Sequence, residues 1–232
     1  MLKNRWTILC DFDGTIANVD VIDRLLECHG QPGWEDLENR WRAGKIGSRE
    51  CMQGQVALLD MDAAQLDALL DQVDIDAAFP AFVEKAMALG HSVQIVSDGM
   101  DYAIRRILSR HGLGWIPVAA NRLVQAGPRL WNLASPHRQE GCQAGTCKCG
   151  VADAARDRTS LPVLLIGDGR SDFCAADSVD HVFAKSSLLT HCRSLGLSHS
   201  PVESFADVLA LLPGIQRYAQ PLVPAAGAAA TV

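Results

Sequence analysis

The feature that most constrains this chain is a short apolar segment that runs directly into two carboxylates. Residues 7–10 read Thr-Ile-Leu-Cys, and Asp-Phe-Asp-Gly-Thr follows at 11–15. A short apolar run that ends at a glycine turn is typical of a central parallel strand. Because side chains alternate along a strand, we expect Asp11 and Asp13 to point the same way at its carboxyl end. Ligand sites of open α/β sheets lie at that end, so this pair is the first candidate site.

Two carboxylates this close at the end of a buried strand repel each other and lose hydration. A divalent cation is the simplest way to keep both ionised. With that charge held, Asp11 can attack phosphorus and Asp13 can transfer a proton. Taken alone, Asp-x-Asp-Gly is as compatible with an ordinary acidic turn as with a catalytic site, so the rest of the chain has to decide.

Length and composition limit the fold and the partners. The chain has 232 residues, 48% of them hydrophobic, which allows one large domain or one domain with an insertion. The net charge of −6 argues against nucleic acids and anionic membranes as partners, but it permits an anionic small-molecule substrate. No segment approaches the ~18 apolar residues of a membrane helix, and we expect no secretory signal before the first strand. A monomer or a homodimer is expected.

The cysteines indicate a reduced protein and leave one loop to explain. Cys142, Cys147 and Cys149 share a polar loop without the paired Cys-x-x-Cys spacing of a zinc site, and a fourth ligand such as His137 would be needed. Loop packing is therefore favoured over zinc binding. The other five are scattered through segments of core-like composition, as expected for free thiols in a cytoplasmic protein: Cys10, Cys28, Cys51, Cys174 and Cys192.

Hydrophobic periodicity divides the chain into an α/β region and a helical insertion. Apolar residues recur at helical spacing in four successive segments between residues 19 and 75. The α/β pattern then resumes, with buried strands predicted at 92–97 and 163–167 and short strands or a hairpin within 115–133. We expect an α/β fold with three parts: a Rossmann-like parallel-sheet core at 1–18 and 76–213, a helical-bundle cap at 19–75, and a flexible C-terminal tail at 214–232.

Two more predicted strands also end in polar turns. Ser-Asp-Gly at 97–99 offers a hydroxyl and a glycine amide, which suit phosphate oxygens. Gly-Asp-Gly-Arg-Ser-Asp follows the other strand at 167–172. Asp168 would complete an oxygen-ligand set with the first pair of aspartates, and Asp172 would be a ligand or an anchor behind the ligands.

Phosphoryl transfer among so many carboxylates also needs a fixed cation, which offsets repulsion between the nucleophile and the phosphate. Between Ser97 and Asp168 the chain contains one lysine, Lys148, in the polar cysteine-bearing loop at 135–150. Its location favours a functional role over that of a solvated loop lysine.

Together, these four groups resemble the ordered motifs of the haloacid dehalogenase-like phosphatases. They are Asp-Phe-Asp-Gly-Thr at 11–15, Ser-Asp-Gly at 97–99, Lys148 and Gly-Asp-x-x-x-Asp at 167–172. The helical insertion resembles the helical cap of that superfamily. Several stretches are similar to the branch that holds the 2-hydroxy-3-keto-5-methylthiopentenyl-1-phosphate phosphatase of methionine salvage, with phosphoserine, phosphocholine and phosphoethanolamine phosphatases as near relatives.

The resemblance implies a mechanism and two binding sites. Asp11 would attack phosphorus and form an aspartyl-phosphate, while Asp13 would protonate the leaving alcohol and then activate water. Lys148 would act beside them as a catalytic cation. The implied Mg²⁺ site consists of Asp11, Asp13, Asp168 and Asp172, and the implied phosphate site consists of Ser97, Asp98, Gly99 and Lys148.

Two departures from the family pattern leave the substrate open. The branch often has glycine where this chain has Asp98, and its lysine-bearing loop carries more cysteines. In the cap, Arg42, Lys45 and Arg49 are either contacts for an anionic substrate group or a solvated basic face, and the solvated face is favoured. Trp34 and Trp41 are expected in the cap core.

Other functions remain compatible with these residues. The aspartyl-phosphate can pass to an alcohol instead of water, which would make the protein a phosphotransferase. A dehalogenase is disfavoured because it has no need of Asp13. A non-catalytic phospho-receiver module is disfavoured by the large cap and by the joint presence of Asp13, Lys148 and Asp168.

Overall fold

One sheet of seven strands forms the centre of the molecule. The computed structural model describes residues 5–218. The strand order is β4-β3-β2-β1-β5-β6-β7, and every neighbouring pair is parallel except β3 and β4. The strands are β1 (Thr7–Cys10), β2 (Ser92–Met100), β3 (Val118–Gln125), β4 (Trp131–Ala134), β5 (Val163–Gly167), β6 (His181–Ala184) and β7 (His199–Pro201). The predicted α/β fold with a parallel sheet is confirmed.

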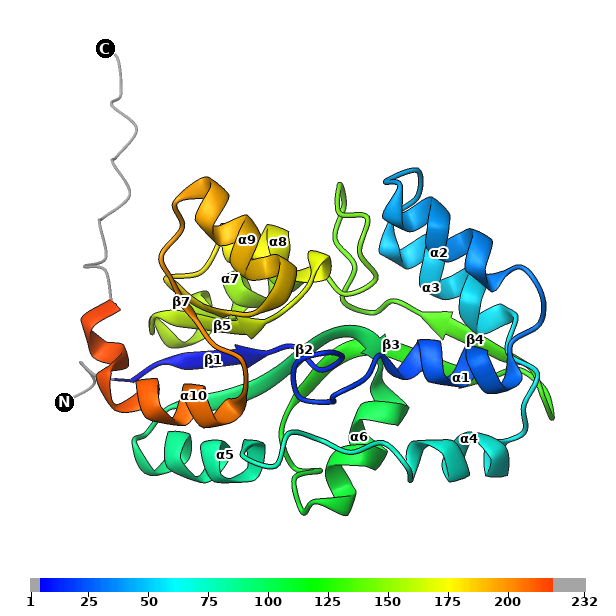
Figure 1. Ribbon diagram of the computed structural model, residues 1–232, viewed down its shortest axis with the longest axis horizontal. Helices are drawn as coiled ribbons and strands as arrows, with labels where there is room; N and C mark the ends of the chain where they lie inside the picture. Colours follow the sequence, from blue (N-terminus) through cyan, green and yellow to red (C-terminus); the bar gives the residue numbers. More distant parts are fainter. Residues whose placement is uncertain (1–4, 219–232) are drawn as a thin grey trace, which may run out of the picture.

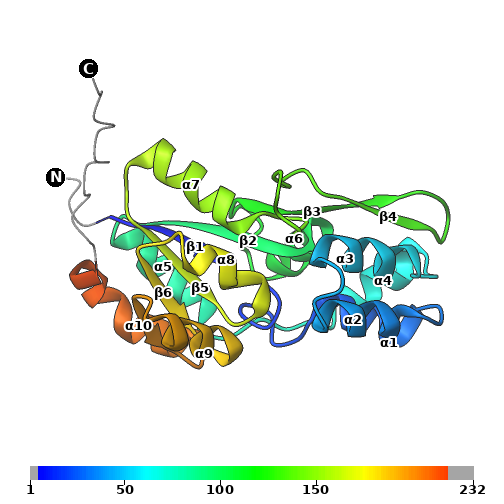
Figure 2. The ribbon, with the colours of Figure 1, turned by 90° about the horizontal axis from the view of Figure 1, so that it is seen from above.

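Helices cover both faces of the sheet (Figures 1 and 2). Alternation along β1 sends Ile8 and Cys10 to one face and Leu9 to the other, so the central strand is buried on both sides. One face carries α5 (Phe79–Ala88), α6 (Asp101–Arg110) and α10 (Phe205–Leu211). The other carries α7 (Lys148–Thr159), α8 (Phe173–Ala176) and α9 (Ser186–Leu195).

Four further helices lie beyond the carboxyl end of β1 (Figure 1). They are α1 (Val21–His29), α2 (Trp34–Arg42), α3 (Ser48–Ala57) and α4 (Ala63–Leu70), and they occupy the stretch for which the sequence predicts four helical segments. Asp62 and Gln65 form the predicted capping box of α4, with hydrogen bonds of 2.9 and 3.0 Å. Asp20 caps α1 by accepting from the backbone N–H groups of Ile22 and Asp23.

The β3–β4 hairpin packs against the inserted helices. The indole Nε1 of Trp131 donates to the carbonyl of Met61 at 2.8 Å, and Gln53 on α3 donates to the carbonyl of Leu133 at 3.4 Å. Arg129 in the hairpin turn forms an ion pair with Asp60. The hairpin therefore forms part of the sheet through its strand pairing, and its side chains and carbonyls contact the helical insertion.

Several boundaries differ from the sequence-based predictions. Strand β2 continues to Met100, because its last residues pair with β3 across an irregular register. Lys148 begins helix α7 instead of lying in a loop. A short 3₁₀ helix (Leu212–Tyr218) buries Ile215, which corrects the predicted tail at 214–218, and residues 219–232 of that tail lie outside the described part.

The cysteines outside the polar loop differ in exposure. Cys28 and Cys174 are exposed rather than core residues, while Cys10, Cys51 and Cys192 are buried as predicted. Within residues 5–218, every helix is too short or too polar to span a bilayer.

Candidate active site

The nucleophile candidate, Asp11, sits in a buried ion pair at the end of β1. Its Oδ1 lies 2.7 Å from Nζ of Lys148 and accepts the backbone N–H of Phe12 at 2.8 Å. Burial raises the pKa of Asp11 well above its usual range, the charge of Asp172 raises it further, and Lys148 opposes both. Burial also lowers the pKa of Lys148, but the Asp11 and Asp172 carboxylates outweigh it and the net shift is upward. Lys148 is therefore a fixed cation, and Oδ2 of Asp11 is the oxygen left without these partners.

Asp172 has both carboxylate oxygens occupied by the protein. Oδ1 accepts from Nζ of Lys148 at 2.7 Å, and Oδ2 accepts from the backbone N–H groups of Asp168 and Gly169 at 3.2 Å each. The side chain is fully buried. Of the two roles that the sequence left open for Asp172, this geometry supports the anchor that holds Lys148 and the turn at Asp168 in place.

Asp13 faces the turn that ends β2. Its Oδ1 accepts the backbone N–H of Val21 at 3.0 Å. The backbone N–H of Gly99 donates to Oγ of Ser97 at 2.9 Å. Burial raises the pKa of Asp13 to about 6, so a group able to give and accept a proton near neutral pH lies close to Asp11 in the chain.

Asp168 completes a group of oxygen donors. Oxygens of Asp11, Asp168 and Asp172 all lie within 4.8 Å of one another, and Thr15 Oγ1 donates to Oδ1 of Asp168 at 3.1 Å. Burial and the charge of Asp172 raise the pKa of Asp168. Hard oxygen ligands with excess negative charge are the donor set that Mg²⁺ prefers, so the residues present fit this ion.

Asp98 points away from Asp13 because successive side chains of β2 alternate in direction. Its Oδ1 accepts from Asn121 Nδ2 at 3.0 Å and from the backbone N–H of Thr146 at 2.8 Å. Asn121 in turn accepts from Oγ of Ser135 at 2.8 Å. This network fixes the segment just before Lys148. Sequence reasoning missed Asn121 and Ser135, because neither lies in a recognisable motif.

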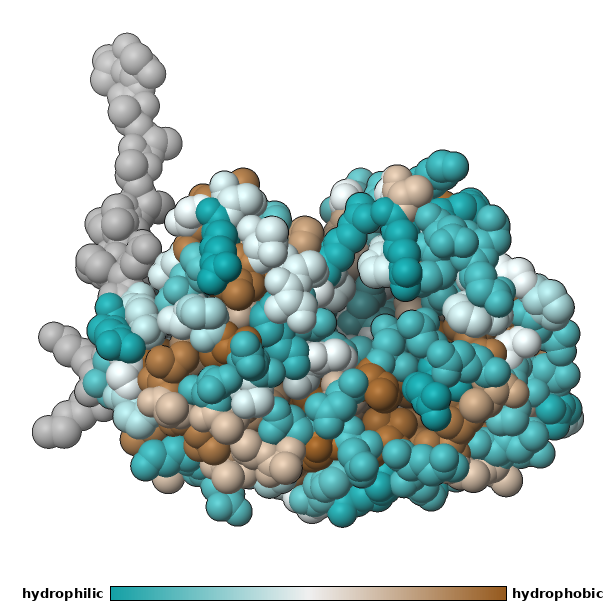
Figure 3. Space-filling view, in the orientation of Figure 1, coloured by the Kyte–Doolittle hydropathy of each residue, from teal (hydrophilic) through white to brown (hydrophobic). Residues whose placement is uncertain are grey.

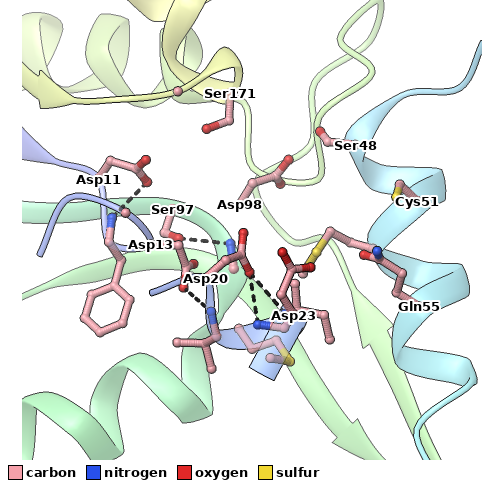
Figure 4. A pocket seen from close by; sticks show the side chains of 18 of the residues that line it. Asp11, Asp13, Asp20, Asp23, Ser48, Cys51, Gln55, Ser97, Asp98 and Ser171 are labelled. Carbon is pink, nitrogen blue, oxygen red and sulfur yellow. Dashed lines mark hydrogen bonds between the residues drawn. The ribbon is translucent and has the colours of Figure 1, made fainter. Parts of the chain in front are cut away.

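A cavity of about 270 Å³ opens in front of these residues. The space-filling view is hollowed between the α8–α9 side and the α2–α3 side, and Asp11 and Ser97 face α3 across the site (Figures 3 and 4). The wall contributed by the inserted helices and the segment before them includes residues that the sequence did not single out for the site: Asp20, Val21, Ile22, Asp23, Glu38, Ser48, Cys51, Met52 and Gln55. Trp41 also lines the cavity, which corrects its expected place in the cap core.

The predicted cap cations lie outside this wall. Arg42 is an exposed partner of Glu38 at 2.8 Å, and neither Lys45 nor Arg49 is among the residues that line the cavity. Arg170, between Asp168 and Asp172 in sequence, lies at its edge instead. Its Nη1 donates to the carbonyls of Arg42 at 3.0 Å and Trp41 at 3.4 Å, so it joins the turn after β5 to the end of α2.

The thiols of the cysteine-bearing loop lie near one another, but within residues 5–218 their sulfur atoms do not surround a single point where a metal ion could bind. The sulfurs of Cys147 and Cys149 are 3.2 Å apart, and neighbouring thiols affect the pKa values of Cys142 and Cys174. Among the described residues, three possible metal ligand atoms lie within 4.8 Å of one another only in the aspartate group at Asp168, and not among the cysteines. Cys174 was not expected beside this loop.

Comparison with known proteins shows which protein family the chain belongs to. The sequence profile of the haloacid dehalogenase-like hydrolases matches residues 8–177, and the chain belongs to this family. Two similar bacterial proteins are named 2-hydroxy-3-keto-5-methylthiopentenyl-1-phosphate phosphatase. The protein from Brevibacillus brevis is 29% identical over 93% of this chain and 99% of its own. The protein from Geobacillus kaustophilus is 30% identical over 90% of this chain and 96% of its own.

Solved structures share the fold. A substrate-bound phosphoserine phosphatase matches 89% of this chain and 97% of its own with a TM-score of 0.71 and 18% identity. A phospho-aspartyl intermediate analogue of phosphoserine phosphatase matches with a TM-score of 0.69 and 17% identity, over 89% of this chain and 98% of its own. The family, the bacterial relatives and this fold together indicate a phosphoric monoester hydrolase.

Proposed function

We propose that the protein is a Mg²⁺-dependent phosphatase that hydrolyses a small phosphomonoester through an aspartyl-phosphate on Asp11. The observation that carries this proposal is the contact of Lys148 with Asp11 at 2.7 Å, beside the oxygen donors of Asp168. This arrangement pairs a nucleophilic carboxylate with a fixed cation, and the donors can bind a metal that neutralises the phosphate. The family membership supports the same chemistry.

In the proposed first step, Oδ2 of Asp11 forms a bond to phosphorus while the bond to the leaving alcohol oxygen breaks. Asp13 gives its proton to that oxygen. In the second step Asp13 takes a proton from water, the water oxygen bonds to phosphorus, and the bond to Asp11 breaks. Ser97, Gly99 and Lys148 would hold the phosphate oxygens, with Asp98 positioning the lysine-bearing segment. Bound Mg²⁺, held by Asp11, Asp168 and the backbone carbonyl of Asp13, would supply positive charge to the phosphate oxygens.

We also propose that residues 19–75 act as a cap over residues 1–18 and 76–213. The helices α1, α2 and α3 supply one wall of the cavity, and the core residues after β1, β2 and β5 supply the other. A cap in this position would exclude water from the aspartyl-phosphate until the alcohol has left. Arg170 would hold the closed arrangement through its contacts to the end of α2.

The names of the bacterial relatives make 2-hydroxy-3-keto-5-methylthiopentenyl-1-phosphate the first ester to test. Phosphoserine, phosphocholine and phosphoethanolamine are the alternatives. At about 30% identity, the type of reaction can be inferred from the relatives more safely than the contacts to the alcohol part of the substrate. Substrate selectivity depends on individual side chains of the cap.

Phosphate release from this panel, with and without Mg²⁺, tests the proposal. We expect release that requires Mg²⁺ and that falls at least a thousandfold in Asp11→Asn. Asp36→Asn, an exposed change on α2, serves as the matched control and should leave release unchanged. Transfer of phosphate to an added alcohol in place of release would assign a phosphotransferase. Stable phosphorylation of Asp11 without turnover would assign a receiver module and contradict hydrolysis.

A further inference from the structure

Lys148 is the first residue of helix α7, so the placement of its side chain depends on the residues just before that helix. The first N–H groups of a helix have no carbonyl partner inside the helix. Two hydrogen bonds from the preceding residues fix this end instead. The backbone N–H of Thr146 donates to Oδ1 of Asp98 at 2.8 Å, and that of Cys147 donates to the carbonyl of His137 at 3.0 Å.

Asn121 on β3 determines where the acceptor for Thr146 lies. The Asn121 side chain is fully buried, and its Nδ2 donates to the carbonyl of Asp98 at 2.6 Å and to Oδ1 of Asp98 at 3.0 Å. The amide is itself oriented by Oγ of Ser135, which donates to Oδ1 of Asn121 at 2.8 Å. Because both hydrogens of the Nδ2 group serve Asp98, Asn121 fixes the main chain and the side chain of that residue together.

The loop before Lys148 also packs directly on Asn121. A Cβ at Gly145 would overlap the side-chain amide of Asn121. Since Gly145 has no side chain, the loop can lie against the amide while the next residue, Thr146, donates to Asp98. Asn121 therefore contacts the loop at one residue and supports it through Asp98 at the next.

The carboxylate of Asp98 is used by the protein and not by a ligand. Oδ1 accepts the hydrogen bonds from Asn121 and Thr146, and Oδ2 is closed to solvent without a partner among the described residues. A carboxylate that bound the substrate would need one of these oxygens open to the cavity. The geometry therefore supports a connection between the turn at 97–99 and the lysine-bearing loop.

The other end of the same loop supports the inserted helices. The backbone N–H of Arg49, in the first turn of α3, donates to the carbonyl of Gln143 at 3.1 Å. A Cβ at Gly47 would lie 2.5 Å from Cβ of Gln143, so the two segments are in direct contact. The loop at 143–147 therefore contacts the start of α3 before it reaches Lys148.

We infer that Asn121 is a positioning residue of the reaction. It acts through Asp98 on the loop at 143–147, and this loop holds Lys148 at the nucleophile and supports the start of α3. The inference rests on the proposed phosphatase function and adds to it a residue outside the phosphate site and the metal donors. Loss of the Asn121 amide should displace the catalytic cation and one wall of the cavity together.

Steady-state kinetics of Asn121→Ala test the effect on the reaction. Because a displacement of about 1 Å at a catalytic group can cost about a hundredfold in rate, kcat for the best ester of the panel should fall at least tenfold. Ser135→Ala removes the bond that orients the amide and should lower kcat by a smaller factor. The control Ser200→Ala breaks hydrogen bonds to His181 and Tyr218, far along the chain from the loop. It should lower the unfolding midpoint and leave kcat unchanged.

A double-mutant cycle tests whether Asn121 acts through Asp98. If it does, the variant that combines Asp98→Ala with Asn121→Ala should lose no more kcat than Asp98→Ala alone, because the second change removes an interaction that is already lost. Independent effects would multiply. A purely structural role of Asn121 would lower stability without this dependence in kcat.

Hydrogen exchange followed by mass spectrometry gives a readout without turnover. In Asn121→Ala, the amides of residues 143–148 and of the first turn of α3 should exchange at least tenfold faster than in the wild type, while the peptide that carries β6 keeps its rate. Ser200→Ala should show the reverse, with faster exchange in β6 and β7 and an unchanged loop. Local release of the loop is thereby distinguished from destabilisation of the whole chain.

Failure of the inference and failure of the function give different results. Wild-type kcat in Asn121→Ala, or losses that multiply in the double variant, would overturn the positioning role while the phosphatase function stands. Unchanged exchange in the loop would overturn the support by Asn121 whatever the activity. Absence of release from every ester, by the wild type and Asp11→Asn alike, would overturn the phosphatase function and with it the role of Asn121 in the reaction.

Discussion

Oδ1 of Asp172 lies 2.7 Å from Nζ of Lys148, and both side chains are closed to solvent. The same lysine contacts Asp11 at 2.7 Å, so one cation is shared between the proposed nucleophile and Asp172. The pair joins α7 to the turn after β5, two segments that carry different parts of the site. Breaking this ion pair should therefore lower the stability of the fold as well as the activity.

Asp172→Asn should destabilise the protein by about 3 kcal/mol, because removal of one partner leaves a buried lysine partly uncompensated. Urea unfolding at neutral pH measures this loss. The control is Asp71→Asn, which breaks an exposed ion pair of 2.8 Å with Arg106. Exposed pairs contribute little, so the control should unfold like the wild type. Equal midpoints for all three proteins would contradict the structural role of Asp172.

Gly99→Ala should reduce phosphatase activity about a hundredfold with little change in folding, because small displacements of catalytic groups cost rates of that order. A Cβ at position 99 would lie 2.5 Å from Oδ2 of Asp13 and 3.0 Å from Oγ of Ser97, so the carboxylate must move. Gly127→Ala is the control, since its Cβ would meet nothing nearer than 3.4 Å. Steady-state kinetics and thermal unfolding separate the two effects, and an active Gly99→Ala protein would argue against Asp13 as the proton donor.

Arg170→Gln should raise KM about fivefold, which corresponds to the loss of roughly 1 kcal/mol of hydrogen bonding between the core and α2. The loop from Ala43 to Gly47 should also be cleaved faster by proteases, since it follows the end of α2 that Arg170 holds. Arg193→Gln, at an exposed position of α9, serves as the control. An unchanged KM together with unchanged cleavage would show that Arg170 does not hold the cap.

His181 should make stability depend on pH. It is 1% exposed, its ring nitrogens contact Oγ of Ser198 at 2.8 Å and Oγ of Ser200 at 3.0 Å, and the ring stacks on Tyr218. Burial lowers the pKa of His181 to about 4. Since histidine in an unfolded chain titrates near about 6.5, the unfolded state binds more protons below that pH. The contribution to stability is present above pH ~6.5 and is lost as the pH falls toward ~4.

The measurement for His181 is a double difference. Between pH 7 and pH 4.5, the unfolding free energy of the wild type should fall by about 2 kcal/mol more than that of His181→Asn. His111→Asn, at the exposed end of α6, should behave like the wild type. The comparison cancels the carboxylates whose raised pKa values act in the opposite direction. A parallel pH dependence in the wild type and His181→Asn would contradict burial of the neutral ring.

Local patterns predicted the elements that hold Asp11, Ser97 and Asp168, because each follows a short apolar strand whose glycine turn is visible in the sequence. They also predicted the helical insertion, whose apolar spacing is regular. Lys148 was identified by elimination, yet its place at the start of α7 was not, because glycines and cysteines hide the helix that follows.

The wall of the cavity could not be predicted in the same way. Asp23 and Trp41 have the spacing of ordinary helix residues, and which side of a helix faces a cavity depends on the packing of the whole insertion. The pairing of Asp98 with Asn121 joins residues in different strands, and no local pattern specifies such a contact. Arg42, Lys45 and Arg49 agree with the favoured prediction of a basic face turned away from the site, since none of them lines the cavity.

The contacts of the β3–β4 hairpin with α3 and with Met61 have a consequence for protein engineering. The unit that would have to be exchanged to give this chain another selectivity is discontinuous. A chimera that receives only residues 19–75 from a relative would place foreign helices on Trp131, Leu133 and Arg129, whose hydrogen bonds and ion pair are matched to the present insertion. A transplant should therefore carry residues 118–134 along with the helices.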